Sequence, residues 1–437
     1  MRNDVSIPHR RLVLAHVYAD DNKGDLGIIQ ATVLGLSTAA EATGVRLDVT
    51  AMSMFGGGDI ELPNTHRLLR TIVPEVVPAP VTQRYQEPRG VIRSLTKAIS
   101  VPVQILSMLS RIALWRARIP SMLCRSLAAI RSADALVCKG GSLLYCDQSV
   151  RGHFFLFRML CPIAAAILLK RPSFIFGQSI GPFRTPLSRS LMRAIGKRMS
   201  CIYVRDELSL EHLRELGIPA GKLRLIPDPA FLLTRYASRE ARDPSRPMLG
   251  VTALNVTRDQ EAQSQYERKI ATVISTFLDR HPGWSIRFLP QVIGPDPWQD
   301  DRIVQRRIAS LVPEKYRESI SIEEEDYTPL ELCTRYSAVD LLLASRLHSS
   351  IFASVVSTPA VVLEYQQAKA KGAFTWLGRP DDVMPWQTDA KVISQALDYK
   401  VAHLESERAQ LDATVEKLAN ALQWELQGIV AQFAFAK

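Results

Sequence analysis

The residues best suited to chemistry in this chain are an arginine and a histidine in the segment Ser345–His348. The apolar run Leu341–Ala344 precedes this segment, and residues 349–356 after it have the composition of a helix. A strand that leads into a helix places its last residues at the carboxyl edge of an open α/β sheet, where such sheets bind ligands. Arg346 offers a fixed cation and His348 a group that titrates near neutral pH, so the pair suits an anionic substrate and proton transfer. An isolated Arg-x-His also occurs by accident as a surface arginine and a capped histidine, so the rest of the chain has to decide.

Two glycine-bearing segments in the first half could also meet an anion. Asn22–Asp25 lies between an expected strand and an expected helix, where Gly24 allows close approach and the helix start offers N–H groups. Asp25 also suits a helix N-cap. Lys139–Ser142 follows another expected strand, and its small residues could hold phosphate or carboxylate against backbone N–H groups. The spacing of a P-loop is absent, and no segment shows the Gly-x-Gly-x-x-Gly of a dinucleotide site.

Three further positions complete the set. The segment Gly177–Pro182 is expected to be another strand-to-helix loop, and Arg205 stands at the end of an expected strand. Asp228, between two prolines, could act as a catalytic base, but its position favours the structural role of an Asx-turn residue.

Strand and helix signals alternate in both halves of the chain, which argues for parallel sheets covered by helices on both faces. Strands are expected at residues 11–18, 47–54, 133–138, 173–176 and 199–204, and again at 249–254, 285–289, 319–322, 340–344 and 360–363. The charged, proline-bearing stretch 234–247 separates the two series. We therefore expect an α/β fold with two Rossmann-like domains facing a cleft, residues 1–235 and 236–402, followed by a helical segment, residues 403–437, that packs back on the body.

Charge is distributed unevenly over the 437 residues. From Pro88 to Arg205 nineteen Lys and Arg stand against two acids, a local net charge of +17 in a chain whose net charge is +10. This asymmetry predicts an anionic partner for the first half, although a basic face that only aids solubility is the alternative. The stretch Ala98–Met122 mixes bulky apolar residues with cations only, which is typical of a helix on a membrane surface and equally of a core helix with exposed arginines.

Other site classes find little support in the composition. The six cysteines show no Cys-x-x-Cys spacing and indicate buried reduced thiols in a cytosolic protein. The acidic run Glu323–Asp326 is expected to be an exposed loop, and we expect no metal. The N-terminal residues 1–11 do not read as a signal peptide, and no apolar run has the length of a spanning helix.

Taken in order, these motifs resemble the polysaccharide pyruvyl transferase family, specifically the enzymes that modify secreted polysaccharides such as colanic acid. The resemblance covers roughly residues 12–378, and Lys139 departs from it where many members have a third glycine. The matching positions are Asn22, Gly24, Asp25, Gly140, Gly141, Ser142, Gln178, Ser179, Gly181, Arg205, Asp228, Arg346, His348, Tyr365 and Lys369.

The resemblance implies a fold similar to the B form of glycosyltransferases and transfer of the enolpyruvyl group of phosphoenolpyruvate onto two hydroxyls of a sugar. The products would be a pyruvate ketal and phosphate, with no cofactor besides the donor. Arg205 and Arg346 would bind the carboxylate and phosphate, because guanidinium groups form paired hydrogen bonds with both. His348 would protonate the vinyl carbon. The remaining matching positions would bind substrate, and Arg346→Ala or His348→Ala is expected to abolish ketal formation without unfolding the chain.

The resemblance also implies the partners. The acceptor would be a glycan or a polyprenyl-diphosphate-linked oligosaccharide on the side of the first domain, with phosphoenolpyruvate on the side of the second. We expect a cytoplasmic protein in peripheral contact with the anionic inner face of the membrane, and no nucleic acid. Two alternatives stay open: a nucleotide-sugar-dependent glycosyltransferase of the B form, and a non-catalytic protein that binds polysaccharide or nucleic acid.

Overall fold

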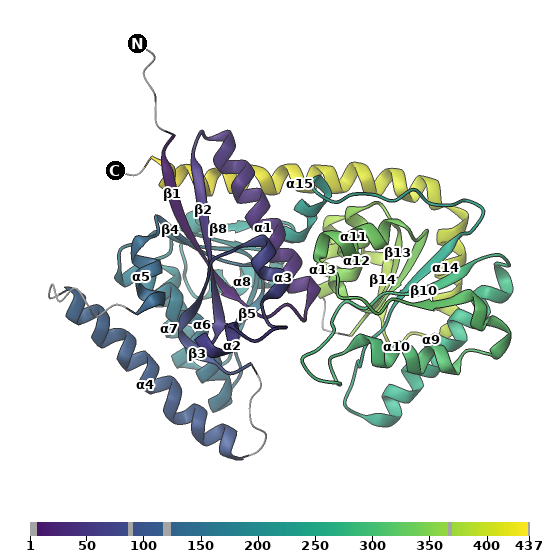
Figure 1. Ribbon diagram of the computed structural model, residues 1–437, viewed down its shortest axis with the longest axis horizontal. Coiled ribbons are helices and arrows are strands. Elements are labelled where there is room, and N and C mark those ends of the chain that lie inside the picture. Colours follow the sequence, from purple (N-terminus) through teal and green to yellow (C-terminus); the bar gives the residue numbers. More distant parts are fainter. Residues whose placement is uncertain (1–6, 86–90, 117–123, 366–368, 436–437) are drawn as a thin grey trace, which may run out of the picture. The chain divides into compact units, whose positions relative to one another are not determined.

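The chain forms two α/β units, each with its own parallel sheet and hydrophobic core. The computed structural model describes residues 7–85, 91–116, 124–365 and 369–435 (Figure 1). Unit 1 consists of Met1–Asp20, Ile28–Pro229 and Ala421–Lys437, and unit 2 consists of Asp21–Gly27 and Ala230–Asn420.

Unit 1 is built on an eight-stranded sheet in which every strand pair is parallel. Its strands, in spatial order, are β3 (Val76–Gln83), β2 (Arg46–Phe55), β1 (His9–Val17), β4 (Ala135–Cys138), β6 (Ser173–Phe183), β7 (Cys201–Val204) and β8 (Leu223–Leu225), with β5 (Gly141–Cys146) paired to β6. Its helices are α1 (Lys23–Ala42, whose first turn belongs to unit 2), α2 (Gly57–Ile60), α3 (Arg67–Ile72), α4 (Val91–Arg116), α5 (Arg125–Ser132), α6 (Val150–Leu168), α7 (Pro186–Gly196) and α8 (Glu207–Glu215). The strand order reverses between β1 and β4, so the carboxyl ends of these two strands mark the switch point of the sheet.

Two segments predicted as strand-to-helix loops are strands instead. Residues Lys139–Ser142 lead from β4 into β5, and Gly177–Pro182 form the second half of β6. The two segments pair with each other, with Gly141 opposite Gln178. Glycine and proline normally signal a turn, but here Gly177 and Gly181 adopt positive φ angles of 76° and 89°, which lets the strand bulge and continue.

The edge strand β3 carries Pro78 and Pro80, and the sequence pattern does not predict it. Proline removes a backbone donor, so within a sheet it is restricted to edges, which is where β3 lies. The second part of α6, from Met159 on, is apolar and mostly buried. Among the described helices, α6 alone has the length and apolar composition to cross a bilayer, yet its residues from Met159 to Ile163 are buried in the core of unit 1.

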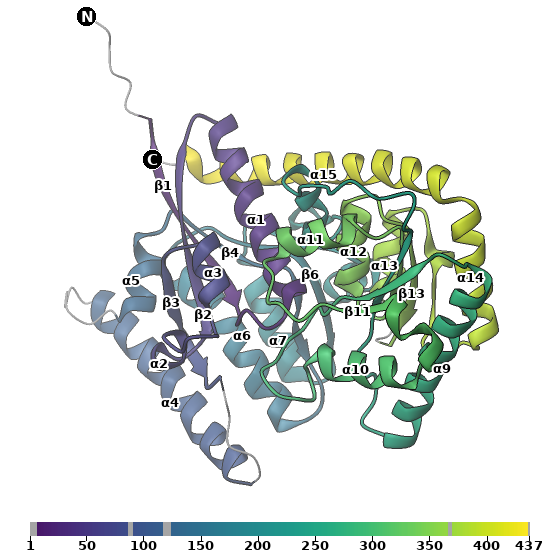
Figure 2. The same ribbon diagram turned by 45° about the vertical axis from the view of Figure 1, so that its right-hand side comes forward.

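Unit 2 contains a six-stranded parallel sheet with the order β11-β10-β9-β12-β13-β14, which is the Rossmann arrangement. Its strands are β9 (Met248–Thr252), β10 (Ser285–Phe288), β11 (Ile320–Ile322), β12 (Leu341–Ala344), β13 (Ala360–Glu364) and β14 (Val383–Pro385). Its helices are α9 (Gln260–Arg280), α10 (Asp301–Leu311), α11 (Pro329–Ser337), α12 (Leu347–Val355), α13 (Lys369–Trp376) and α14 (Ala390–Ala402). The strand order reverses between β9 and β12, and Figure 2 shows helices on both faces of this sheet.

The predicted C-terminal helix is α15 (Leu404–Ala434). Its apolar residues at helical spacing, Leu411, Val415, Leu418 and Leu422, are buried, as the amphipathic pattern requires. The six cysteines are free thiols, and all but Cys124 are buried.

Candidate functional site

The segment Ser345–His348 lies where the sequence places it, directly after β12 at the switch point of the unit 2 sheet. Buried hydrogen bonds hold its first residue: the hydroxyl of Tyr266 donates to Oγ of Ser345 at 2.8 Å, and the Ser345 N–H donates to Oγ1 of Thr252 at 3.1 Å. The strand end is therefore rigid, which fixes the direction in which the next residues leave the sheet.

Arg346 is anchored by a buried carboxylate that the sequence does not single out. Nε and Nη2 of Arg346 donate to Asp301, with a shortest distance of 2.6 Å, and Asp301 also accepts the N–H groups of Gln291 and Val292 at 3.0 Å. Burial lowers the pKa of Arg346, but the Asp301 carboxylate outweighs this and raises it above the ordinary value. Nη1 of Arg346 makes no hydrogen bond within the described part of the chain, and 17% of the side chain is exposed. One edge of the guanidinium is thus fixed by Asp301, whereas Nη1 has no hydrogen-bond partner among the described residues.

His348 packs against a glycine more than three hundred positions earlier in the chain. A β-carbon built on Gly24 would lie 2.5 Å from Nδ1 of His348, so only glycine fits here. The imidazole is half-buried, and its centroid lies 6.4 Å from that of Phe352 on the next turn of α12. The structure therefore brings together two predicted site residues, and the imidazole of His348 packs directly on the backbone of Gly24.

The segment Asn22–Asp25 is the first turn of α1 rather than a loop. Asn22 caps the helix, because its Oδ1 accepts the N–H groups of Gly24 and Asp25 at 3.0 and 3.4 Å, while Nδ2 donates to Asp25 Oδ2 at 3.1 Å. The predicted N-cap, Asp25, is instead the third residue of the helix. This arrangement uses the side chain of Asn22 to satisfy the helix start and fixes Gly24 under His348.

The acidic run Glu323–Asp326 holds cations of unit 2. Lys23, which is buried, pairs with Asp326 at 2.5 Å, and Arg306 pairs with Glu324 at 2.5 Å. Within the described residues, no group of three or more His, Cys, Asp or Glu side chains could hold a metal ion.

The two predicted residues that follow β13 are less tightly defined. Tyr365 lies near enough to Arg346 to contribute to the raised pKa of that arginine. Lys369 is the first residue of α13 and is half-buried. Most of the predicted site residues of unit 2 therefore lie at one edge of its sheet, among them Gly24, Arg346, His348 and Tyr365.

Arg205 forms the centre of a second cluster, in unit 1. Its Nε donates to Oγ of Ser179 at 3.0 Å, Nη1 to Asp228 at 2.5 Å, and Nη2 to Oγ of Ser142 at 3.1 Å. Arg205 and Asp228 retain only 8% and 2% of their side-chain surface, so the ion pair is buried. Four residues predicted separately thus form one network at the carboxyl edge of the sheet. All three nitrogens of Arg205 donate to protein, so the network supports Arg205 as the residue that orders the two serines.

Next to this cluster lies a buried histidine, His16, that no sequence motif indicates. Nε2 of His16 is 2.7 Å from the carbonyl oxygen of Met159, so Nε2 carries the hydrogen and Nδ1 accepts from Nε2 of Gln178 at 3.0 Å. The same nitrogen of Gln178 donates to the carbonyl oxygen of Lys139 at 2.7 Å. His16 has a φ of 65°, unusual for a residue with a side chain, and the network holds it there. A histidine inside an apolar strand gives no sequence signal of this role.

The His16 network predicts a loss of stability in acid. Burial, supported by the charge of Lys139, lowers the pKa of His16 to about 4, against 6.5 in the unfolded chain. The contribution of His16 to the free energy of unfolding is fully present above pH 6.5. It falls by about 3 kcal/mol in all as the pH drops to about 4, because only the unfolded chain takes up the proton in this range. His16→Asn, which tolerates the positive φ, should remove this part of the pH dependence in urea unfolding between pH 7 and 4. Parallel curves for variant and wild type would contradict the assignment.

The predicted glycines frame the unit 1 cluster. Gly140 and Gly141 join β4 to β5, beside Gln178 of β6. Gly181 has a positive φ and faces the ring of His212, since a β-carbon there would lie 2.4 Å from His212 Nδ1. Gly141 and Gly181 are strand positions, and a β-carbon on Gly140 would lie 2.8 Å from the carbonyl oxygen of Gly177.

A comparison with protein families identifies one that covers most of the chain. The family described as polysaccharide pyruvyl transferase matches residues 59–367, a range that contains Arg205, Asp228, Arg346, His348 and Tyr365. A curated relative, the amylovoran biosynthesis protein AmsJ of Erwinia amylovora, is 26% identical over 277 residues, or 60% of this chain. The chain spans 64% of the length of that relative.

Solved structures share the fold over almost the whole chain. A putative UDP-N-acetylglucosamine 2-epimerase from Listeria monocytogenes has a TM-score of 0.58 at 10% identity, covering 98% of both chains. The UDP-GlcNAc 2-epimerase from Neisseria meningitidis, bound to UDP-GlcNAc, has a TM-score of 0.57 at 11% identity, covering 97% of this chain and 100% of that one. These likenesses concern the fold alone.

The predicted fold class is confirmed, with two parallel α/β sheets, a C-terminal helix and structural neighbours of the glycosyltransferase B type. The family match extends over well more than half of the 437 residues and includes the anchored arginines of both units. On these grounds the chain belongs to the polysaccharide pyruvyl transferase family.

Proposed function

We propose that this protein transfers the enolpyruvyl group of phosphoenolpyruvate onto a sugar of an exopolysaccharide or of its lipid-linked precursor. The products are a pyruvate ketal and inorganic phosphate. The observation that carries the proposal is the pair formed by Arg346 and His348 at the switch point of the unit 2 sheet, one held by Asp301 and the other seated on Gly24. The family membership and the exopolysaccharide relative agree with it.

The residues suit each chemical step. Nη1 of Arg346 can donate hydrogen bonds to the carboxylate or phosphate of the donor while Asp301 keeps the guanidinium oriented. His348 delivers a proton to the methylene carbon, which becomes a methyl group, and a sugar hydroxyl adds to the neighbouring cationic carbon. Phosphate then leaves as the second hydroxyl closes the ring. The two hydroxyl protons balance the proton gained by the methyl carbon and the one carried by the phosphate.

We assign the donor substrate to unit 2 and the acceptor to unit 1. Unit 2 holds the donor through Arg346 and His348, with Tyr365 and Lys369 beside them, and unit 1 serves the acceptor. The buried Arg205–Asp228 pair keeps the hydroxyls of Ser142 and Ser179 in fixed positions, where they can bind sugar hydroxyls. The acceptor is a glycan or a polyprenyl-diphosphate-linked oligosaccharide, reached at an anionic membrane.

The experiment compares two donors with one acceptor. Exopolysaccharide stripped of its ketals by mild acid is incubated with the protein and phosphoenolpyruvate, or with the protein and UDP-sugars. We expect phosphate release and a new ketal methyl resonance in the first reaction and no release of UDP in the second. The opposite result would favour a nucleotide-sugar-dependent glycosyltransferase.

A further inference from the structure

Helix α4 of unit 1 has two apolar faces, although a surface helix needs only one. One face packs on α6 and β3 through Val101, Met108 and Ile112, which are buried. The opposite face turns away from unit 1 (Figure 1) and carries apolar side chains at helical spacing. These are Ile99, Val103, Leu106 and Leu114, exposed by 66%, 59%, 69% and 39%, with Leu109 beside them.

Such a stripe is unusual on a protein surface and indicates a covering partner. The charges around it indicate which kind. Arg111 and Arg116 flank the stripe on α4, and the sequence from Pro88 to Ala133 contains no acidic residue. An apolar face bordered only by cations is the composition of a helix that lies in the interface of an anionic membrane. The predicted surface segment extended to Met122; residues 117–122 are outside the described part of the chain.

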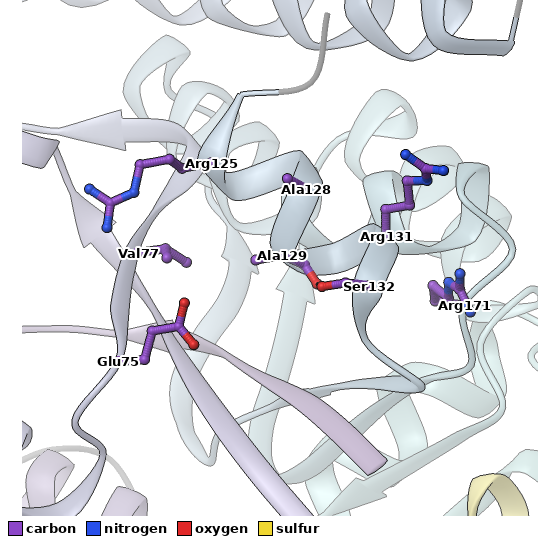
Figure 3. Close-up of a pocket in the computed structure, with 8 residues that line it drawn as sticks. All are labelled: Glu75, Val77, Arg125, Ala128, Ala129, Arg131, Ser132 and Arg171. Carbon is purple, nitrogen blue, oxygen red and sulfur yellow. The ribbon is translucent and has the colours of Figure 1, made fainter. Parts of the chain in front are cut away.

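Beside the C-terminal end of α4 lies a pocket of about 650 Å³ whose lining includes three arginines and one glutamate (Figure 3). Figure 3 shows Arg131 and Arg171 at one end and Arg125 with Glu75 at the other. The guanidinium of Arg131 stacks 4.8 Å above the ring of Trp115, which joins the pocket to α4. Nε of Arg171 is buried without a hydrogen-bond partner among the described residues.

The pocket belongs to the amino edge of the unit 1 sheet. Arg131 and Arg171 directly precede β4 and β6, whereas the Arg205 cluster lies at the carboxyl ends of the strands. The pocket is therefore a separate basic site, with donors suited to phosphate oxygens.

We propose that unit 1 docks on an anionic lipid surface, with the exposed stripe of α4 in the interface and Arg131 and Arg171 on lipid phosphates. The inference deepens the proposed function by naming the surface that brings the protein to a lipid-linked acceptor. Its test contains no donor and no acceptor, so it can fail while pyruvyl transfer stands.

The test is sedimentation of the full chain with vesicles of phosphatidylglycerol and phosphatidylcholine, or of phosphatidylcholine alone. We expect binding only to the anionic vesicles. Leu106→Asn should weaken it about tenfold through the lost apolar burial, and Arg131→Glu or Arg171→Glu at least as much through the lost phosphate contact. All three side chains are at least partly exposed, and melting curves verify that the variants fold.

Leu187→Asn and Arg189→Glu on α7 are matched controls, because both residues are exposed and belong to the same unit. They should bind like the wild type. If Arg189→Glu and Arg131→Glu weakened vesicle binding equally, net charge alone would explain the effect, and the assignment of the pocket as a phosphate site would be wrong. Equal binding to neutral vesicles, or a wild-type dimer that Leu106→Asn makes monomeric in sedimentation velocity, would overturn the membrane assignment.

Discussion

His348→Ala is expected to slow phosphate release from phosphoenolpyruvate by a factor of about 10² to 10⁴, because the reaction loses its proton donor. The imidazole is half-buried and packs on Gly24 and Phe352, so its removal should change the melting temperature little. The rate is measured with saturating donor, and melting is followed by circular dichroism. His403→Ala, an exposed histidine in the same unit, is the control and should keep the wild-type rate.

Gly24→Ala tests the same assignment without altering the imidazole itself. The added methyl group would meet His348 Nδ1 at 2.5 Å, so the ring must move. A displacement near 1 Å costs about a hundredfold in rate when a group must meet its target in one geometry. Wild-type turnover in both His348→Ala and Gly24→Ala would remove His348 from the mechanism.

The second large effect is expected at the buried Arg346–Asp301 pair. Asp301→Ala leaves a guanidinium without its counter-charge and two backbone N–H groups without an acceptor, so the free energy of unfolding should fall by about 3–5 kcal/mol. Arg346→Ala should cost a similar amount, which corrects the expectation that this variant leaves the fold unaffected. Urea unfolding of the single variants and of a double variant, Arg346→Met with Asp301→Leu, measures the coupling.

The free energy of unfolding should fall less in the double variant than the sum of the two single losses, because the double variant buries no unpaired charge. Glu314→Ala breaks an exposed ion pair with Arg317 and provides the comparison, with an expected change of about 0–1 kcal/mol. Additive losses for Arg346 and Asp301 would show that the two side chains act independently, against the geometry.

Local sequence patterns predicted the elements of unit 2 well, because apolar runs and helix signals alternate clearly there. They placed Ser345–His348 at a sheet edge, since the end of an apolar strand is a local property. They did not identify Asp301 as the partner of Arg346, because the two lie 45 positions apart and an acid at a helix start is ordinary. In unit 1, Gly177 and Gly181 signalled a loop, whereas pairing with β5 kept the chain extended. Tertiary pairing decided each of these cases.

The positions of the chain's two ends in the units have a consequence for synthesis on the ribosome. Unit 2 includes Asp21–Gly27, and unit 1 includes Ala421–Lys437, so each unit needs a segment from the opposite end of the sequence. Unit 2 made from residues 230–420 alone would lack the glycine beneath His348 and the lysine that pairs with Asp326. Multidomain chains usually complete their N-terminal domain first as they emerge. Here the contacts between α15 and unit 1, such as the hydrogen bond from the Gln423 side chain to the carbonyl oxygen of Gly35, cannot form until α15 has left the exit tunnel.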